Sequence, residues 1–397
     1  MKKFGDRKIF IVSPTESVLT KRGKRHPNLA NFLSLNGEKI CYLTSTINHA
    51  EKTLFNKKEI LQAKDNLDYE VKFFSAGLYK SNITFKRVIW NYIFSLKVLF
   101  YLLRNSNKGD MVIFPSRPSE LLIVAVLVKI FKKTKLFLDV EDIWPDAFLI
   151  KNKLIKFTFY LYCNIINNFS VRFFDSGVHV SENFKDWLKR YNVKYDSKLS
   201  VLGVTKEEDM PKYLKEYSKF KKSEITFFYG GTLTLQFDIM PLLEAINKTG
   251  FNCKIILAGD NGSGNRFNKV DKYLKENNFK FINLGNVSKK VLLKNLGESD
   301  IVIIPMISGG LPKKFFDAIG CFKPILNMGK GGVYSEIEKN GFGWNTTFEI
   351  EDIERLLLNL TVSDIASKIK NIHKNREQYM EDQSIKIIYK EIQKNFK

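Results

Sequence analysis

A short basic stretch, Ser308-Gly-Gly-Leu-Pro-Lys-Lys-Phe-Phe-Asp317, combines residue types that suit the binding of a phosphorylated ligand. It lies between two apolar runs of strand length, and Gly309 permits a tight turn after the first of them. Pro312 suits the first position of a helix, where its missing amide proton removes no hydrogen bond. The free amides at the start of such a helix, with Lys313 and Lys314 beside them, would attract phosphate.

Asp317 adds a carboxylate to this basic helix start. It follows Lys314 by three residues and Lys313 by four, so the three side chains lie on about the same helical face. In one interpretation the lysines bind a diphosphate while Asp317 binds a sugar hydroxyl. In the other, the segment is a surface helix with an ordinary ion pair between neighbouring turns. The stretch alone leaves both open.

Length and composition indicate a two-domain protein of a reducing compartment. The chain has 397 residues, of which 44% are hydrophobic, enough for two cores of ordinary size. Its four cysteines are far apart in apolar surroundings and form no Cys-x-x-Cys pair, which favours buried thiols over disulfides or a zinc site. The first residues do not have the pattern of a signal peptide. We therefore expect a cytoplasmic protein; the cysteines are Cys41, Cys163, Cys253 and Cys321.

The formal net charge of +22 indicates an anionic partner. Nucleic acid, anionic lipid and phosphorylated small molecules all suit a field of this sign. The basic residues are spread along the whole chain, and no nucleic-acid-binding motif accompanies them. We therefore expect a nucleotide-type ligand and an anionic membrane surface as partners, and no nucleic acid.

The first half of the chain alternates apolar runs of strand length with helical segments, as nucleotide-binding α/β folds do. The loop after the first run is strongly basic and lacks a dinucleotide-binding fingerprint. We expect Gly23, Arg25 and His26 in this loop to lie on the acceptor or phosphate side of a site, although a solvated run of charges is the alternative. The predicted strands are Lys8–Val12, Lys39–Leu43, Tyr69–Phe74, Asp110–Phe114, Leu136–Val140, Gly177–Ser181 and Leu199–Val204.

The segment Ile83–Arg104 is long and apolar enough to raise the question of a membrane span. Lys86 and Lys97 interrupt it, and a lysine near the centre of a span costs about 2.5–3.5 kcal/mol on insertion scales. We predict a helix at the membrane interface, with Trp90 and Tyr92 as amphipathic anchors. A helix fully buried against a sheet is the alternative.

Carboxylates gather where the strand Leu136–Val140 ends, the edge at which ligands bind in open α/β sheets. We expect Asp142 and Asp146 to act as an acid, as a base or in acceptor binding. The pair Asp139 and Glu141 superficially resembles the metal-binding motif of single-domain glycosyltransferases. Because Asp139 lies inside the predicted strand, we expect no bound metal ion.

The alternation of strand and helix restarts after a charged stretch at 206–224, which we interpret as a linker. We therefore predict an α/β protein with two Rossmann-like parallel-sheet domains, at 1–205 and 225–378, facing each other across a cleft. A last helix at 379–397 could pack back on the first domain. The second set of predicted strands comprises Ile225–Tyr229, Lys254–Ala258, Phe279–Asn283 and Ile301–Pro305.

The order of four motifs resembles that of the GT-B glycosyltransferases of family 4, in particular their bacterial cell-surface polysaccharide branch. Asp139–Asp146 resembles the acidic-Trp-Pro turn, and Gly230–Asp238 resembles the loop that opens the second domain. Leu284–Ser288 is similar to the nucleotide-base loop, and Leu311–Ile325 to the Pro-x-Lys-x-Phe-Glu segment with its following strand. The four motifs span most of the chain.

The resemblance implies transfer of a hexose or N-acetylhexosamine from a nucleotide-sugar, expected to be UDP-linked. The acceptor would be lipid-linked or a saccharide, the enzyme would be peripheral at the inner face of the membrane, and the reaction would retain configuration without a cofactor. Asp317 would bind the ribose, and Lys314 would neutralise the diphosphate beside the catalytic acids Asp142 and Asp146. The implied donor-binding residues are Gly231, Thr232, Gly259, Asn261, Asn286, Val287, Gly310, Leu311, Lys313, Lys314 and Asp317.

Three departures from the family pattern leave other functions open. Asp317 stands where the family usually has glutamate, and Gly309 stands where it has its first acidic residue. The segment from Thr232 to Asp238 contains no basic residue. A sugar-nucleotide epimerase on the same fold and a non-catalytic binding protein for nucleotide-sugar or lipid are the alternatives.

Overall fold

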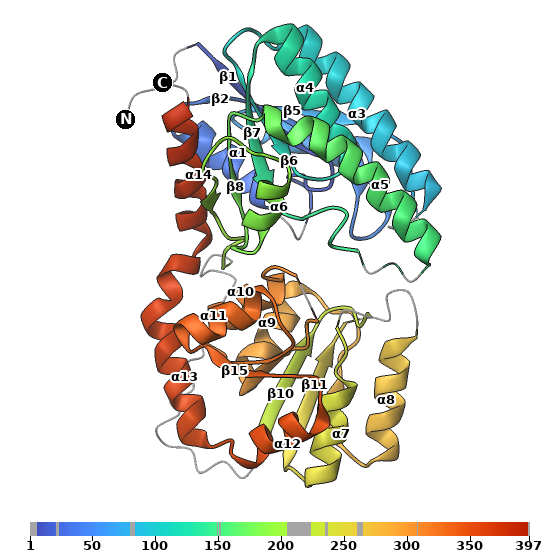
Figure 1. Ribbon diagram of the computed structural model, residues 1–397, viewed down its shortest axis with the longest axis vertical. Coiled ribbons are helices and arrows are strands. Elements are labelled where there is room, and N and C mark those ends of the chain that lie inside the picture. The colour runs from blue at the N-terminus through green and yellow to red at the C-terminus, as the bar shows by residue number, and fades with distance from the viewer. Residues whose placement is uncertain are drawn as a thin grey trace. The chain divides into compact units, whose positions relative to one another are not determined.

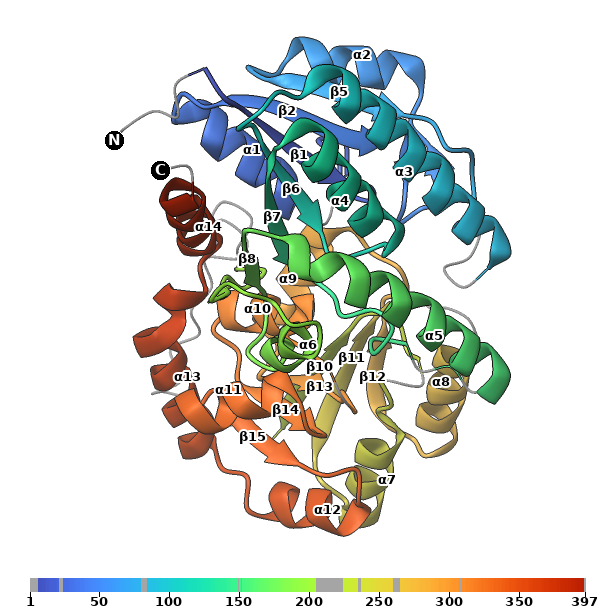
Figure 2. The same ribbon diagram turned by 45° about the horizontal axis from the view of Figure 1, so that its top comes forward.

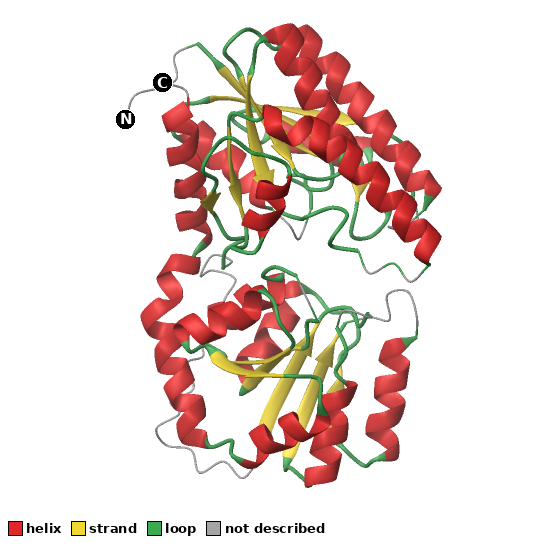
Figure 3. Ribbon diagram, viewed as in Figure 1, coloured by secondary structure: helices red, strands yellow, loops and turns green. Residues whose placement is uncertain are grey.

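The computed structural model describes residues 6–20, 24–79, 84–148, 150, 152–204, 224–234, 237–259, 265–307 and 309–395. They form two compact units, one of Met1–Ser200 with Ile385–Lys397 and the other of Val201–Ser384. Each unit is built on a parallel β-sheet with helices packed against it (Figures 1 and 3). The predicted fold class is thus confirmed. Of the stretch interpreted as a linker, 205–223 lies outside the described residues.

The first unit contains a seven-stranded sheet in the order β5-β2-β1-β6-β7-β8-β9, all of whose pairs are parallel. Its central strands are apolar along their whole length because helices cover both faces. A two-stranded antiparallel ribbon, β3 and β4, lies outside the sheet. The strands are β1 Lys8–Ser13, β2 Lys39–Ser45, β3 Ile47–Asn48, β4 Thr53–Leu54, β5 Glu70–Phe74, β6 Met111–Pro115, β7 Lys135–Val140, β8 Ser176–His179 and β9 Lys198–Leu199.

The helices of the first unit form a layer on each face of this sheet. Residues of α1 and of the C-terminal helix α14 share one core with inward-facing residues of β1 and β2. Helices α3, α4 and α5 lie side by side on the other face (Figures 1 and 2). The helices are α1 Arg25–Leu35, α2 Lys57–Asp65, α3 Phe85–Asn105, α4 Glu120–Lys132, α5 Lys153–Ser170, the short η1 Val171–Phe173, α6 Phe184–Arg190 and α14 Glu381–Asn395.

Two expectations for the first half need correction. Helix α1 begins at Arg25, so Arg25 and His26 belong to its first turn and not to the preceding loop; the Glu16 carboxylate accepts the His26 amide at 3.1 Å. The strand expected over 199–204 ends at Leu199. Beyond it Gly203 has a φ of +85°, which takes the chain out of the extended conformation.

The second unit contains a six-stranded parallel sheet in the order β12-β11-β10-β13-β14-β15. A large apolar core lies between one face of this sheet and helices α7, α8, α12 and α13, while α9, α10 and α11 lie against the other. The strands are β10 Ile225–Gly230, β11 Cys253–Ala258, β12 Lys280–Asn283, β13 Ile301–Ile304, β14 Ile325–Met328 and β15 Gly343–Thr346. The helices are α7 Met240–Thr249, α8 Arg266–Glu276, α9 Lys289–Glu298, α10 Lys313–Gly320, α11 Gly332–Asn340, α12 Ile350–Leu358, α13 Val362–Asn375 and the short η4 Arg376–Tyr379.

Helix α10 follows the predicted sequence of strand, glycine turn and helix. Gly309 has a φ of +124°, a conformation that favours glycine. Pro312 occupies the N-cap instead of the expected first helical position, because the helix begins at Lys313. The helix is buried from Phe315 to its end at Gly320. This packing holds the basic start of α10 at the end of β13.

In each sheet the strand order reverses direction at one point, between β1 and β6 in the first and between β10 and β13 in the second. Ligands of open α/β sheets bind outside the carboxyl ends of the strands at such a point. The loops after these four strands carry Glu16, Arg117, Gly231 and Gly309. The topology therefore places one candidate binding edge in each unit.

Candidate functional site

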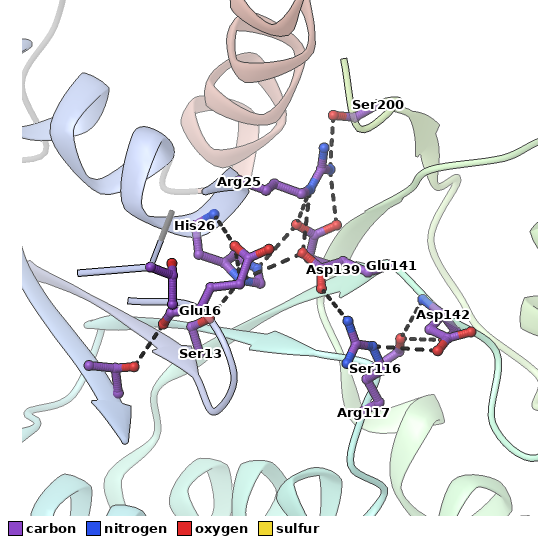
Figure 4. A network of polar contacts seen from close by, with 12 residues as sticks. Ser13, Glu16, Arg25, His26, Ser116, Arg117, Asp139, Glu141, Asp142 and Ser200 are labelled. Atoms are coloured by element: carbon purple, nitrogen blue, oxygen red, sulfur yellow. Dashed lines mark hydrogen bonds and ion pairs between the residues drawn. The ribbon is translucent and has the colours of Figure 1, made fainter. Parts of the chain in front are cut away.

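The binding edge of the first unit holds a dense network of charged side chains (Figure 4). Ser13 and Glu16 come from the end of β1, Arg117 follows β6, and Asp139 and Glu141 come from the end of β7. Glu141 is 7% exposed and Asp139 is 1% exposed, so these charges are held away from bulk water. Because buried charges must be compensated, the network is made of alternating acids and bases.

Arg25 and Asp139 form the most buried ion pair of this network. The Arg25 Nε donates to Asp139 Oδ2 at 2.7 Å, and Nη2 donates to Oδ1 at 3.0 Å, which is the bidentate geometry of a strong pair. Nη2 also donates to Ser200 Oγ at 3.1 Å. Burial alone would raise the pKa of Asp139, but Arg25 and then His26 hold that pKa below its usual range. The charge of Arg25, which we expected to face an anionic ligand, is thus neutralised inside the protein.

His26 lies between three carboxylates. Its Nε2 is 3.3 Å from Asp139 Oδ2, and its Nδ1 is 3.6 Å from Glu141 Oε1 and 3.1 Å from Ser13 Oγ. Burial opposes the charged imidazolium, but Glu141, Asp139 and Glu16 together raise the pKa of His26 to about 9. Burial and the neighbouring Glu141 raise the pKa of Glu16 to about 7. The site therefore holds a charged histidine and a carboxyl group that titrates near neutral pH.

The two acids expected to be catalytic lie in different surroundings. Asp142 is 35% exposed at the rim of the network, where its Oδ2 is 3.5 Å from the Arg117 Nε. Arg117 Nη2 also lies 3.6 Å from Glu141 Oε2, so it links Asp142 to the buried groups. Asp146 accepts a hydrogen bond at 2.8 Å from Arg190 Nη1 of α6. Within the described residues only Asp142 of these two carboxylates is joined to the network.

Glu16, His26 and Glu141 could in principle hold a cation, since each offers one ligand atom and these atoms lie within 4.8 Å of one another. Two observations argue against a metal ion at this place. The Arg25 Nε lies 3.9 Å from Glu141 Oε1, and the Arg117 Nη2 lies 3.6 Å from Glu141 Oε2. The donor set therefore fits a hydrogen-bonded ion network better than a metal centre.

In the second unit, close backbone contacts bring the loops after β10, β11 and β12 together. The Gly231 amide donates to the Ala258 carbonyl at 2.8 Å, and the Gly259 amide donates to the Gly285 carbonyl at 2.8 Å. A Cβ atom at position 259 would lie 2.1 Å from the Gly231 carbonyl oxygen, so only glycine fits there. Thr232, another predicted donor residue, accepts the Tyr229 hydroxyl through its carbonyl at 3.0 Å.

Lys314, in the first turn of α10, points its side-chain nitrogen into this group of loops. The Nζ atom lies 4.3 Å from the ring centre of Tyr229 and 4.1 Å from that of Phe237. A Cβ atom at Gly231 would be 3.3 Å from it. The Nζ is buried, and within the described part of the chain it has no hydrogen-bond partner. Burial without a compensating anion lowers the pKa of Lys314 to about 7.

Asp317 does not pair with either lysine of its own helix. Its Oδ1 lies 2.5 Å from the Nζ of Lys289, the first residue of α9, and its side chain is 8% exposed. Lys313 is exposed, and its Nζ donates to the Gly203 carbonyl at 3.2 Å. The alternative of a surface helix with an ion pair between its own turns is therefore wrong.

The other expected donor residues border the same edge of the sheet or lie beyond what is described. Asn286 and Val287 follow β12, with Asn286 exposed and Val287 half-buried. Gly310 and Leu311 lead into α10, and Leu311 is buried. The remaining two predicted residues, Gly23 of the first unit and Asn261 of the second, lie outside the described residues.

Three residues of these two edges were not anticipated from the sequence. Glu16 and Arg117 join the first network, and Lys289 joins the second edge as the partner of Asp317. Arg117 lies two residues beyond the end of β6, and Lys289 directly follows Ser288, the N-cap residue of α9. These positions could have indicated both residues from the sequence. The role of Glu16 had no such signal, because it depends on where α1 packs.

A cavity of about 770 Å³ lies elsewhere in the second unit, beside the ends of β14 and β15. Tyr334, Trp344 and Phe348 supply aromatic walls, and Asn345 and Asp352 supply polar groups. None of the predicted site residues lines this cavity. The candidate donor edge at the β10–β13 switch point is thus distinct from this cavity.

Comparison with models of known protein families and with curated proteins finds no match. Solved structures do match along the whole chain. Sucrose-phosphate synthase from Thermosynechococcus elongatus has a TM-score of 0.69 at 12% identity, covering 98% of this chain and 99% of its own. HepE from Anabaena in complex with UDP-glucose has a TM-score of 0.65 at 14% identity, and the match covers 98% of this chain and 99% of the HepE chain.

A third match, WaaG, a glycosyltransferase involved in lipopolysaccharide biosynthesis, has a TM-score of 0.63 at 11% identity and covers 96% of this chain and 99% of its own. The chain has the GT-B fold of these glycosyltransferases. At such low identities the likeness concerns the fold, and the activity has to be argued from the two polar edges.

Proposed function

We propose that the protein is a glycosyltransferase that moves a sugar from a nucleotide-sugar, expected to be UDP-linked, to a lipid-linked or saccharide acceptor. The observation that carries this proposal is Lys314, whose buried side-chain nitrogen has no hydrogen-bond partner among the described residues and which lies with Asp317 at the switch point of the second sheet. The HepE structures with UDP-glucose and with UDP, which share the fold, support a uridine nucleotide as the donor.

The chemistry of sugar transfer assigns a part to each of these groups. The bond between the anomeric carbon and the diphosphate breaks, and its electron pair leaves with the diphosphate oxygen. Lys314 in its charged form, together with the free amides at the start of α10, stabilises that negative charge. The Asp317 carboxylate, held by Lys289, accepts hydrogen bonds from the ribose hydroxyls.

The acceptor would bind at the polar edge of the first unit. Its hydroxyl oxygen forms the new bond to the anomeric carbon and gives up its proton. Of the two predicted carboxylates, Asp142 is the more suitable to accept this proton. It is partly exposed beside the charged network, whereas Asp146 is paired with Arg190. We further propose retention of configuration and membership of family 4, supported by the order of the four sequence motifs.

We expect the enzyme to act at the inner face of a membrane, in cell-surface polysaccharide synthesis. The fold shared with WaaG, a glycosyltransferase involved in lipopolysaccharide biosynthesis, supports this setting. None of the helices within the described ranges is long and apolar enough to cross a bilayer. Association would therefore be peripheral, through side chains at the protein surface.

A thermal-shift screen against nucleotide-sugars tests the donor. A ligand present at a hundred times its Kd stabilises the folded state by about 2.7 kcal/mol, so the true donor should raise the melting temperature clearly. UDP should do so as well, and Lys314→Met should clearly reduce the shift at the same UDP concentration.

Product analysis then separates the competing functions. Transfer of the sugar to an acceptor supports the proposal. Isomerised nucleotide-sugar formed without an acceptor would identify an epimerase. Donor binding without turnover under any acceptor condition would identify a non-catalytic binding protein, and absence of any nucleotide-sugar binding would contradict the donor site.

A further inference from the structure

The first unit exposes many large apolar side chains on one layer of helices. In α3 these include Phe85 at 78% exposure and Phe100 at 67%, and in α5 Leu154 at 71% and Phe157 at 64%. Phe131, at the end of α4, is 67% exposed. Isolated exposed apolar residues are common on proteins, but a gathering on adjacent helices marks an interaction surface.

Helix α3 is apolar on two opposite faces. Trp90 and Phe94 lie on the buried face toward the sheet. Ile89, Ile93 and Leu96, with Phe100, recur at helical spacing on the exposed face. The exposed stripe is therefore not needed for the core of this unit. A helix that contributes one face to the core and a second apolar face to the surface needs a second partner.

Helix α5 has the same organisation. Cys163, Ile166 and Asn167 are buried, whereas Leu154, Leu161 and Ile165 recur on the exposed side. Exposure of Leu161 is 50% and that of Ile165 is 61%. Two of the longest helices of the first unit thus present apolar stripes of similar length.

Contacts join the two stripes across α4 into one surface. The hydroxyls of Tyr92 on α3 and Tyr162 on α5 are 2.8 Å apart, and Tyr162 also bonds to Glu120 at the start of α4. At the other end, Lys129 of α4 donates to the Phe173 carbonyl just beyond α5. The three helices lie side by side in both views of the molecule (Figures 1 and 2). We call this surface the α3–α5 face.

The exposed charged side chains on α3, α4 and α5 are all basic. Neither α3 nor α5 contains an aspartate or glutamate, and the one acid of α4, Glu120, is buried. Lysines flank the apolar stripes of both helices. They are Lys86, Lys97, Lys153 and Lys156, all exposed.

We propose that the α3–α5 face docks on the surface of a lipid bilayer that contains anionic phospholipids. Apolar stripes with basic flanks and no acid suit the boundary between acyl chains and negative headgroups. Tyr92 and Tyr162 lie where amphipathic rings favour that boundary. The inference deepens the proposed function by naming the membrane contact, and its link to a lipid-linked acceptor rests on that function. The contact itself can be tested without donor or acceptor.

The test is cosedimentation of the full chain with vesicles of phosphatidylcholine alone or mixed with phosphatidylglycerol. We expect binding to the mixed vesicles that weakens with salt, and much weaker binding to pure phosphatidylcholine. The triple variant Phe100→Gln/Leu154→Gln/Phe157→Gln should bind the mixed vesicles at least about tenfold more weakly, because it removes three apolar side chains from the contact.

A matched control separates the α3–α5 face from apolar surface in general. Leu35→Gln, Leu61→Gln and Leu358→Gln change side chains that are 72%, 59% and 71% exposed on other helices. This second triple variant should bind vesicles like the unchanged protein. Circular dichroism and melting temperature should show that both variants are folded, since all six side chains are exposed.

Three results would overturn the proposal. One is failure of the unchanged protein to bind mixed vesicles at low salt, and another is equal binding by the two triple variants. The third is a stable dimer that the first triple variant converts to monomer without any vesicle binding, which would make a second copy the occupant of the face. Donor binding in the thermal-shift screen is independent of all three, so either proposal can fail alone.

Discussion

The side-chain nitrogen of Lys314 lies 4.3 Å from the ring centre of Tyr229 and, within the described residues, has no hydrogen-bond partner. An aromatic face compensates a buried ammonium only in part, by about 2 kcal/mol when both are desolvated. A phosphate oxygen would supply the missing anion. This relationship therefore leads to the first two predictions.

Replacing Lys314 by methionine should weaken donor binding while leaving the fold intact. Methionine keeps the packing against Tyr229 but carries no charge, so we expect the Kd for UDP to rise at least about tenfold. The melting temperature of the free protein should stay the same or rise, because a buried unpaired cation is lost. Isothermal titration calorimetry and thermal unfolding measure both. The exposed Lys294→Met on α9 is the control and should change neither quantity.

Donor binding should take up a proton above pH 7. With a pKa of about 7, roughly nine-tenths of free Lys314 is neutral at pH 8, whereas a bound diphosphate favours the charged form. The apparent affinity should fall by up to about tenfold per pH unit above 7 until the pKa of the bound form is reached. Calorimetry at pH 8 in buffers of different ionisation enthalpy counts the protons. An uptake that persists in Lys314→Met would assign it to another group.

Adding a methyl group at Gly259 should damage the second unit far more than adding one at Gly250. A Cβ atom at 259 would overlap the Gly231 carbonyl oxygen, so the loops after β10 and β11 must separate. At Gly250, which caps α7 with a φ of +62°, nothing lies within 4 Å. We expect Gly250→Ala to cost about 1 kcal/mol from backbone strain and Gly259→Ala about 3 kcal/mol or more, with loss of UDP binding. Denaturant unfolding measures the loss of stability in each variant, and a titration with UDP measures binding. Equal losses of unfolding free energy in the two variants would contradict the close contact between the loops.

Lys289 and Asp317 should behave as a coupled pair. Lys289→Met leaves the 8% exposed Asp317 carboxylate without its cation, so we expect a loss of about 3 kcal/mol in unfolding free energy. Adding Asp317→Asn should recover much of that stability, because the double variant buries no charge. Asp317→Asn alone should weaken binding of a nucleotide-sugar about tenfold by removing charged acceptors for the ribose. Additive stability changes in this double-mutant cycle would show that the two residues are not coupled.

The contribution of His26 to stability should decrease as the pH rises from 7 to 9. The pKa of His26 is about 9 in the folded protein and about 6.5 when unfolded, so the folded form binds the proton more tightly. The stabilisation is complete below pH 6.5 and lost as the pH passes 9, about 3 kcal/mol in all. Comparing the protein with His26→Asn at each pH cancels the titration of Lys314, which both proteins share. Glu16, whose pKa is raised by burial and Glu141 and lowered by His26, contributes to the difference near pH 7. A difference that does not narrow toward pH 9 would contradict a charged His26.

Much of the architecture followed from local patterns in the sequence. The apolar run Ile301–Pro305, the glycines behind it and Pro312 predicted the strand, turn and helix that the structure contains, because each signal acts through neighbouring backbone atoms. The alternation of such units predicted two parallel sheets. These local patterns did not predict which charged side chains pair with each other. Arg25 and Asp139 lie 114 positions apart. Only the pairing of β1 with β6 and of β6 with β7 brings β7, which carries Asp139, close to helix α1, which follows β1 and begins at Arg25.

In helices α3 and α5, too, the sequence determines one property and tertiary packing determines another. Their composition determines that both are apolar around most of their circumference, but periodicity does not tell which of two apolar faces meets the sheet. Packing against α4 and the sheet buries Trp90 and Phe94 and leaves Ile93 and Phe100 outside. For Asp317, likewise, spacing offered two lysines of the same helix, and tertiary structure selected Lys289 of another. The sequence by itself determined the elements, the fold class and the basic helix start. The tertiary structure decided which charges are neutralised and which, like Lys314, stay available for a ligand, because burial and ion pairing depend on contacts between distant segments.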